Sequence, residues 1–191
     1  MIKIGKDTFN WHTCTCQPRT REELLCIINE RISRFGPNCD LNNIDTYLIT
    51  DMSWLFYRSQ FNGNISDWDV SKVENMESMF AYSSFNHDIS RWNVRNVKDM
   101  FFIFAYSKFN QPIGNWNTSK VEDMSNMFCR SVFNQPIEDW DVSNLKYAHN
   151  MFDNSKFNQD ISNWKINKDC KTIAMFNNCP IKKEFKPELP K

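Results

Sequence analysis

The fold is decided by residues 61–84, which read FNGNISDWDVSKVENMESMFAYSS. The same pattern returns at residues 85, 109, 133 and 157, every 24 residues and without an insertion or a deletion. A fixed period of about 20 to 50 residues is typical of a solenoid, in which each coil buries its apolar face only by stacking on its neighbours. With a half coil that begins near Ile44, the array extends to Pro180, which is long enough for such stacking.

Three aromatic columns and one polar column recur at fixed places in the repeat. They are Phe61, Phe85, Phe109, Phe133 and Phe157; Phe56, Phe80, Phe104, Phe128, Phe152 and Phe176; Trp68, Trp92, Trp116, Trp140 and Trp164; and Asn62, Asn86, Asn110, Asn134 and Asn158. A polar side chain beside Phe is costly to bury without partners, so the Asn column predicts a structural hydrogen-bonded ladder, with a row of ligand-binding amides as the alternative. The Trp column predicts core, with a stacking platform for sugars or bases as the alternative.

Spacing within one coil predicts one short strand and one short helix. Trp68 and Val70 are two residues apart, which favours a strand over about residues 67–71. From Val73 to Phe80 the apolar residues fall on one face of a helix of two or three turns. Stacked in register, the strands would form a parallel sheet and the helices the opposite wall. The sequence therefore predicts an α/β solenoid.

The two ends of the array differ from the repeats. Thr20 and Glu23 form a capping box, and Gly36-Pro37 stops the apolar stripe that follows, which predicts a helix from about Arg21 to Phe35. Such a helix would cover the open face of the first coil. We therefore expect an aperiodic leader over residues 1–19, a helical cap over 20–43, the solenoid over 44–180 and a charged tail over 181–191.

The pattern Ile-x-x-Trp-Asp-Val-Ser-x-Val-x-x-Met-x-x-Met-Phe-x-x-Ser-x-Phe-Asn resembles the bacterial BspA-like leucine-rich repeat family, including the mycoplasma-type lipoprotein repeat. Residues 43–53 are similar to the usual opening of that array, and residues 179–185 to its close. The resemblance implies a leucine-rich-repeat-type solenoid and roles in surface display, adhesion and protein binding. Members of this kind carry signal peptides or lipid anchors, and neither is visible here, so the sequence predicts a cytoplasmic location, with the cell surface reached only by non-classical export.

Charge balance restricts the class of partner. The chain has 23 basic and 23 acidic residues, so it lacks the broad attraction to phosphate backbones or anionic membranes. Its longest wholly apolar run, Met100 to Tyr106, is far shorter than the roughly 20 residues that span a bilayer. The odd number of seven Cys favours reduced thiols. The sequence predicts another protein as partner, with no nucleic acid and no transmembrane segment.

Chemistry-bearing residues do not form a recognisable active site. His12, Cys14 and Cys16 have metal-binding side chains but not the paired spacing of a structural zinc site. The pairs Asp67/Asp69 and Asp139/Asp141 lack the loop that calcium requires. With only four Gly there is no phosphate-binding loop either. We expect no catalytic activity, no cofactor and no metal.

Outward positions of the predicted strands vary from coil to coil, as expected for a binding face on a constant scaffold. They are Asp67, Asp69, Arg91, Asn93, Asn115, Asn117, Asp139, Asp141, Asn163 and Lys165. This strand face is the first candidate for contact with a partner protein, and a solvated surface without a partner is the alternative.

The second candidate is a group of aromatic residues, in which Trp54, Phe101 and Phe102 occupy slots that are polar in other coils and three Tyr residues lie nearby. We name it the aromatic patch: Trp54, Tyr57, Tyr82, Phe101, Phe102 and Tyr106. Such a patch with a polar rim predicts a protein contact, and the alternative is that the N-terminal segment folds back over it. Two functions fit: adhesion to an extracellular host or matrix protein, and an intracellular inhibitor or immunity-like partner.

Overall fold

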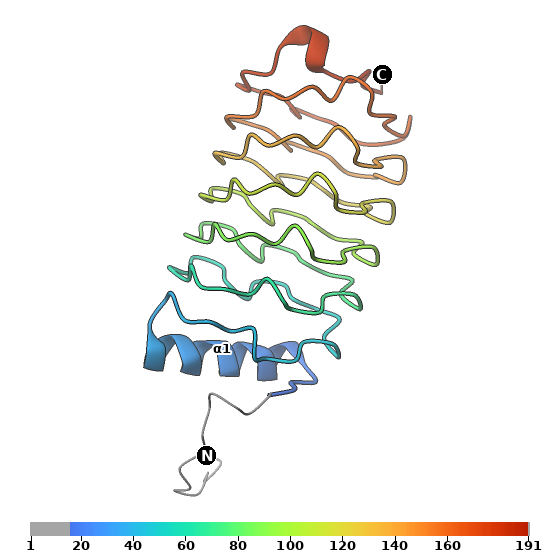
Figure 1. The fold of residues 1–191 in the computed structure, drawn as a ribbon. Coiled ribbons are helices and arrows are strands. Elements are labelled where there is room, and N and C mark those ends of the chain that lie inside the picture. Colours follow the sequence, from blue (N-terminus) through green and yellow to red (C-terminus); the bar gives the residue numbers. More distant parts are fainter. Residues whose placement is uncertain (1–15, 191) are drawn as a thin grey trace, which may run out of the picture.

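The computed structural model describes residues 16–190 and shows a stack of similar coils with a helix at its N-terminal end (Figure 1). Its regular elements are α1 (Arg21–Phe35) and the 3-10 helix η1 (Lys183–Phe185). Parallel bridges join residues 24 apart along one column: Asp51, Asn75, Asp99, Asp123, Tyr147 and Lys171. The predicted 24-residue solenoid is confirmed.

Helix α1 begins and ends where the sequence predicts. The Thr20 side chain accepts a hydrogen bond from the Glu23 backbone N–H at 3.2 Å, and Gly36, with φ of 87°, donates its N–H to the Ile32 carbonyl at 2.9 Å. The helix lies across the first coil (Figure 1) and buries Leu24 and Ile28 completely. It therefore closes the apolar end of the stack.

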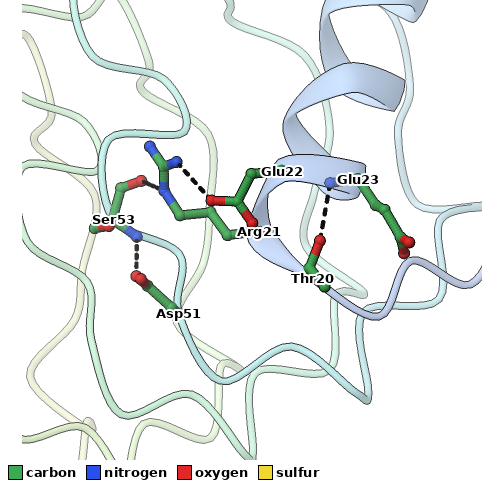
Figure 2. A network of polar contacts seen from close by, with 6 residues as sticks. All are labelled: Thr20, Arg21, Glu22, Glu23, Asp51 and Ser53. Atoms are coloured by element: carbon green, nitrogen blue, oxygen red, sulfur yellow. Dashed lines mark hydrogen bonds and ion pairs between the residues drawn. The ribbon is translucent and has the colours of Figure 1, made fainter.

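A polar contact also fastens α1 to the first coil. Arg21 donates from Nε to the carbonyl of Ser53, whose own N–H donates to the Asp51 carboxylate at 2.8 Å (Figure 2). In later coils the equivalent carbonyl accepts an N–H from the preceding coil, as Glu77 does from Trp54. No coil precedes Ser53 in the stack, and Arg21 supplies the donor instead.

The strand predicted over residues 67–71 and the helix predicted over residues 73–80 are both wrong. Along the second segment the N–H groups of residues 76, 78, 80 and 82 donate to carbonyls of the next coil, at 2.8 to 3.0 Å. In a helix the same N–H groups would have bonded to carbonyls four residues earlier. Both a helix and the observed turns place Met76, Met79 and Phe80 in the interior, so the spacing of apolar residues alone does not distinguish between them.

Each coil wall consists instead of successive turns. Ser83 donates its N–H to the Phe80 carbonyl at 3.2 Å, with Tyr82 at φ of 56° in the third position of the turn. In the preceding turn Met79 donates its N–H to the Met76 carbonyl, and Ser78, with φ of 55°, is in the third position. A positive φ at the third position is typical of a type II turn. Each of six coils places two residues other than Gly in this left-handed region.

One of these left-handed positions predicts a stabilising substitution. Ala174 is exposed and has φ of 54°, where a Cβ costs about 1–2 kcal/mol. We expect Ala174→Gly to raise the free energy of unfolding by about 0.5–1 kcal/mol, after the greater freedom of Gly in the unfolded chain is subtracted. Urea denaturation followed by tryptophan fluorescence measures the change. Ala105→Gly is the control: Ala105 is buried at a negative φ, so that variant should be less stable than the original, and equal shifts would contradict the argument.

Aromatic columns fill the interior of the stack. In the Phe80 column, successive ring centroids through Phe152 are 5.6 to 5.9 Å apart, and in the Phe85 column the spacing through Phe157 is 6.2 to 6.4 Å. The five Trp residues of the column are 3 to 4% exposed, and each of their indole N–H groups donates at 3.0 to 3.2 Å to a carbonyl 27 residues earlier. The Trp column is therefore core, as predicted, and is not available as a stacking platform.

The Asn column forms the predicted ladder. Each side-chain oxygen from Asn62 to Asn134 accepts the backbone N–H of the next Asn at 2.8 or 2.9 Å. Asn158 accepts the N–H of Lys182 at 3.1 Å, which extends the ladder to the tail. Because these oxygens already hold backbone partners, the column is structural.

Candidate functional site: an aromatic patch on the turn wall

The six residues of the aromatic patch lie together on the turn wall and form one connected group. Tyr82 is its centre: its ring stacks on Tyr106 at 4.4 Å between centroids, meets Phe102 at 6.0 Å and meets Tyr57 edge-on at 5.8 Å. Trp54 contacts Tyr57 at 4.7 Å, and Phe101 contacts Phe102 at 5.7 Å. The structure thus brings together side chains from three successive coils.

Solvent reaches every member of the patch. Trp54 is 39% exposed and Tyr106 37% exposed, and the other four are partly buried. Within residues 16–190 no segment covers the patch completely; the leader, which the alternative interpretation places over it, lies largely outside the described residues. A contiguous aromatic surface of this kind is typical of a contact site.

Two arginines that the sequence analysis did not single out border the patch. The Arg58 guanidinium lies 5.3 Å from the Tyr57 ring centroid and 5.2 Å from that of Tyr82. Arg130 lies 5.6 Å from the Tyr106 ring centroid. Both occupy the same slot of the repeat as Tyr82 and Tyr106, so the 24-residue register could have found them.

The backbone beneath the patch is in a conformation that aromatic residues disfavour. Trp54, Tyr82, Phe102 and Tyr106 have φ between 55 and 62°. At the equivalent slots of later coils the chain uses mostly Asn, which tolerates this region: Asn126, Asn150, Asn154 and Asn178. The turn itself therefore does not require aromatic side chains. Aromatic side chains at these four positions carry a backbone cost of about 1–2 kcal/mol per residue.

A buried hydroxyl adds a further cost at this place. Ser78 lies in the same column as Trp54 and Phe102, is fully buried, and its Oγ has no hydrogen-bond partner. A buried unpaired hydroxyl costs about 1–3 kcal/mol.

Carboxyl groups line one side of the patch. Asp51, Asp99 and Asp123 lie in the bridge column, and Glu77 occupies the slot of Phe101 in the preceding coil. Burial raises the pKa of Glu77, and the carboxylates of Asp99, Asp51 and Asp123 raise it further. Burial is also the main cause that raises the pKa of Asp99, with Asp123 and Asp51 adding to it against a hydrogen bond from the Phe101 N–H. We call this group the acidic edge.

All ten strand-face residues are exposed, as predicted, although no strand forms beneath them. Several serve the scaffold itself. The Asp69 and Asp141 carboxylates accept the N–H two residues later at 2.9 and 3.0 Å, and the Asn115 amide donates to the Ser90 carbonyl at 3.0 Å. Asn115, Asn117, Asp139 and Asp141 line an open hollow. These turn and inter-coil bonds explain Asp69, Asp141 and Asn115 without a partner.

Metal and thiol chemistry gain no support from the described part of the chain. It holds no cluster of three or more His, Cys, Asp or Glu side chains that could bind a metal ion. His12 and Cys14 lie outside the described residues, and Cys16 Sγ lies 3.8 Å from Arg31 Nη2. Burial raises the pKa of Cys129 and Cys170 to about 11, so both thiols stay protonated near neutral pH.

Fold and patch together define a repeat solenoid with a constant aromatic core and a variable surface. Residues 29–129 and 104–189 match the family described as "Mycoplasma protein of unknown function, DUF285". These matches cover most of the chain, and the chain belongs to that family. Comparison with curated proteins and with solved structures gives no match. No helix among residues 16–190 has the length and apolar character needed to cross a bilayer.

Proposed function

We propose that this protein is a non-catalytic protein-binding module whose contact surface is the aromatic patch. The observation that supports this most strongly is the use of four aromatic residues at left-handed positions, where the later coils use mostly Asn. Aromatic residues and Arg are the side chains most enriched at the energetic centres of protein interfaces, and the patch has both. The strand face is a secondary candidate, because its residues are exposed but take part in scaffold hydrogen bonds.

We further propose kinship with BspA-like leucine-rich repeat proteins, on the motif quoted above. The module would then serve either as an adhesin that binds a host or matrix protein or as an intracellular inhibitor of another protein. Detection of the protein outside intact cells would favour the first, and a stoichiometric cytosolic partner the second.

A substitution copied from the chain itself tests the patch. Phe101→Ser plus Phe102→Asn introduces the residues that the next coil has at the same two slots, Ser125 and Asn126, so the turn geometry should be retained. We expect the partner's affinity to fall by about 30-fold or more, because a central aromatic contact contributes about 2 kcal/mol or more. Affinity capture with isotope labelling identifies proteins retained by the original and lost by the variant, and calorimetry then gives the dissociation constants.

The matched control changes the strand face. Asn115→Ser plus Asn117→Ser removes two exposed side chains of that surface and should leave the same partner bound. If capture is instead lost with the control and kept with the Phe variant, the strand face is the contact surface and the proposal is wrong.

A further inference from the structure

We propose that the aromatic patch binds a basic segment of its partner, in which Arg or Lys side chains flank an aromatic or aliphatic anchor. This inference rests on the proposed function and adds the chemistry of the segment that is bound. It follows from the carboxylates beside the patch, from the Arg side chains of this chain that stack on its rings, and from the ion pairs in the neighbouring column.

The acidic edge supplies the complementary charge. Asp51, Asn75, Asp99 and Asp123 are consecutive members of one bridge column, so their side chains follow one another at the coil spacing, about 4.8 Å. Each of the four accepts the N–H two residues later at 2.7 or 2.8 Å, which fixes the side chains beside the turn wall. A bound cation would meet a fixed row of three carboxylates and one amide oxygen.

The next column differs from the acidic edge, because its own charges form ion pairs. There Lys98 pairs with Glu74 at 2.7 Å, and Lys146 pairs with Glu122 at 2.6 Å. Those charges cancel within the column. For Glu77 and Asp99 the charged groups with the largest effects are other carboxylates, so negative charge accumulates beside the patch. A basic segment would neutralise this charge, and an acidic one would be repelled.

The ring faces already accept cations from this chain. Arg58 lies over both Tyr57 and Tyr82, and Arg130 over Tyr106, at 5.2 to 5.6 Å from the ring centroids. Guanidinium groups stack favourably on such faces. A partner's Arg could therefore make the same contact on the rings of Trp54 or Tyr106, which are the two exposed members of the patch. Two copies joined patch to patch would bring like charges together, which disfavours a second copy as occupant.

The test uses the full chain and a fluorescein-labelled twelve-residue peptide that contains four Arg, two Trp and Gly-Ser spacers. Two analogues replace the four Arg with Glu or the two Trp with Ser. We expect the Glu analogue to bind at least tenfold more weakly in fluorescence anisotropy, and the Ser analogue to lose affinity as well. Asp99→Asn plus Asp123→Asn should weaken binding of the Arg-Trp peptide about fivefold, because two partly exposed charge pairs that water screens contribute up to about 1 kcal/mol together. Asn is tolerated here, since Asn75 holds the same turn bond.

The control pair is Asp88→Asn plus Asp160→Asn, which removes two turn-capping carboxylates outside both the acidic edge and the strand face. It should leave peptide affinity unchanged.

Equal binding of the Arg and Glu peptides, no binding of either, or an equal loss in both Asp pairs would overturn the inference. Dimers in sedimentation that disappear in Phe101→Ser plus Phe102→Asn would do so too, by making a second copy the occupant. If charge has no effect while that Phe pair still abolishes partner capture, only the basic segment fails; if the Phe pair has no effect, the proposed function fails.

Discussion

Phe104→Ala is expected to lower the free energy of unfolding by about 4 kcal/mol, the largest loss we expect from a single core truncation. Phe104 is fully buried, and its ring centroid lies 4.1 Å from that of Phe109, 5.6 Å from Phe80 and 5.9 Å from Phe128. Truncation removes these contacts and leaves a cavity in the middle of the stack. Because each coil is held only by its neighbours, a weak central coil separates two halves that should then unfold less cooperatively. Urea denaturation followed by both circular dichroism and tryptophan fluorescence measures the loss and the separation of the transitions.

Phe101→Ala is the matched control for this prediction. It removes the same side chain from the same coil, but at a partly exposed position of the aromatic patch. We expect it to change stability by less than about 1 kcal/mol, as is usual for surface substitutions, while it weakens partner binding. A loss of similar size in both variants would mean that the patch belongs to the core, and the argument for a contact surface would be lost.

The residues that could be predicted from the sequence are those that repeat. Phe104, Trp116 and Asn110 recur in every coil at fixed slots, and each fixed slot has one environment, so burial and the Asn ladder follow from the period alone. The aromatic patch could be predicted for the same reason: Phe101 and Phe102 depart from slots that are polar in most other coils. The limits of α1 could be predicted because its capping residues are local signals.

What could not be predicted depends on atoms far apart in the chain. The N–H of Ser78 donates to a carbonyl 23 residues later, and a local pattern of apolar residues carries no information on such a bond. The left-handed conformation of Tyr82 and Phe102 could not be predicted either, because aromatic residues rarely adopt it. The acidic edge is different, because Asp51, Asp99 and Asp123 share one slot of the 24-residue register and could have been predicted from it.

Gly63→Ala is expected to destabilise the protein by about 3 kcal/mol, at the upper end of what overpacking usually costs. Equivalent slots in later coils hold His87, Gln111, Gln135 and Gln159, so the coil itself accepts a side chain. Gly63 differs because its coil stacks on the cap: a Cβ there would meet the backbone carbonyl of Cys39. Backbone hydrogen bonds on both sides hold Gly63 close to Cys39. The Asn62 N–H donates to the Pro37 carbonyl at 2.8 Å, and the Leu41 N–H donates to the Asn64 carbonyl at 2.9 Å.

The damage from Gly63→Ala should stay near the N-terminal end of the stack. Hydrogen exchange is expected to accelerate in α1 and in the first coils, while amides of the C-terminal coils keep their protection, because coils interact only with their neighbours. Gln111→Ala, at the same slot two coils later, should change neither stability nor exchange by a comparable amount. Since Arg21 of α1 holds the Ser53 carbonyl beside Asp51 (Figure 2), a displaced cap should also disturb the nearest part of the acidic edge. Binding of the Arg-Trp peptide should therefore weaken in Gly63→Ala and not in Gln111→Ala, and uniform loss of protection along the whole chain would contradict this local picture of the cap.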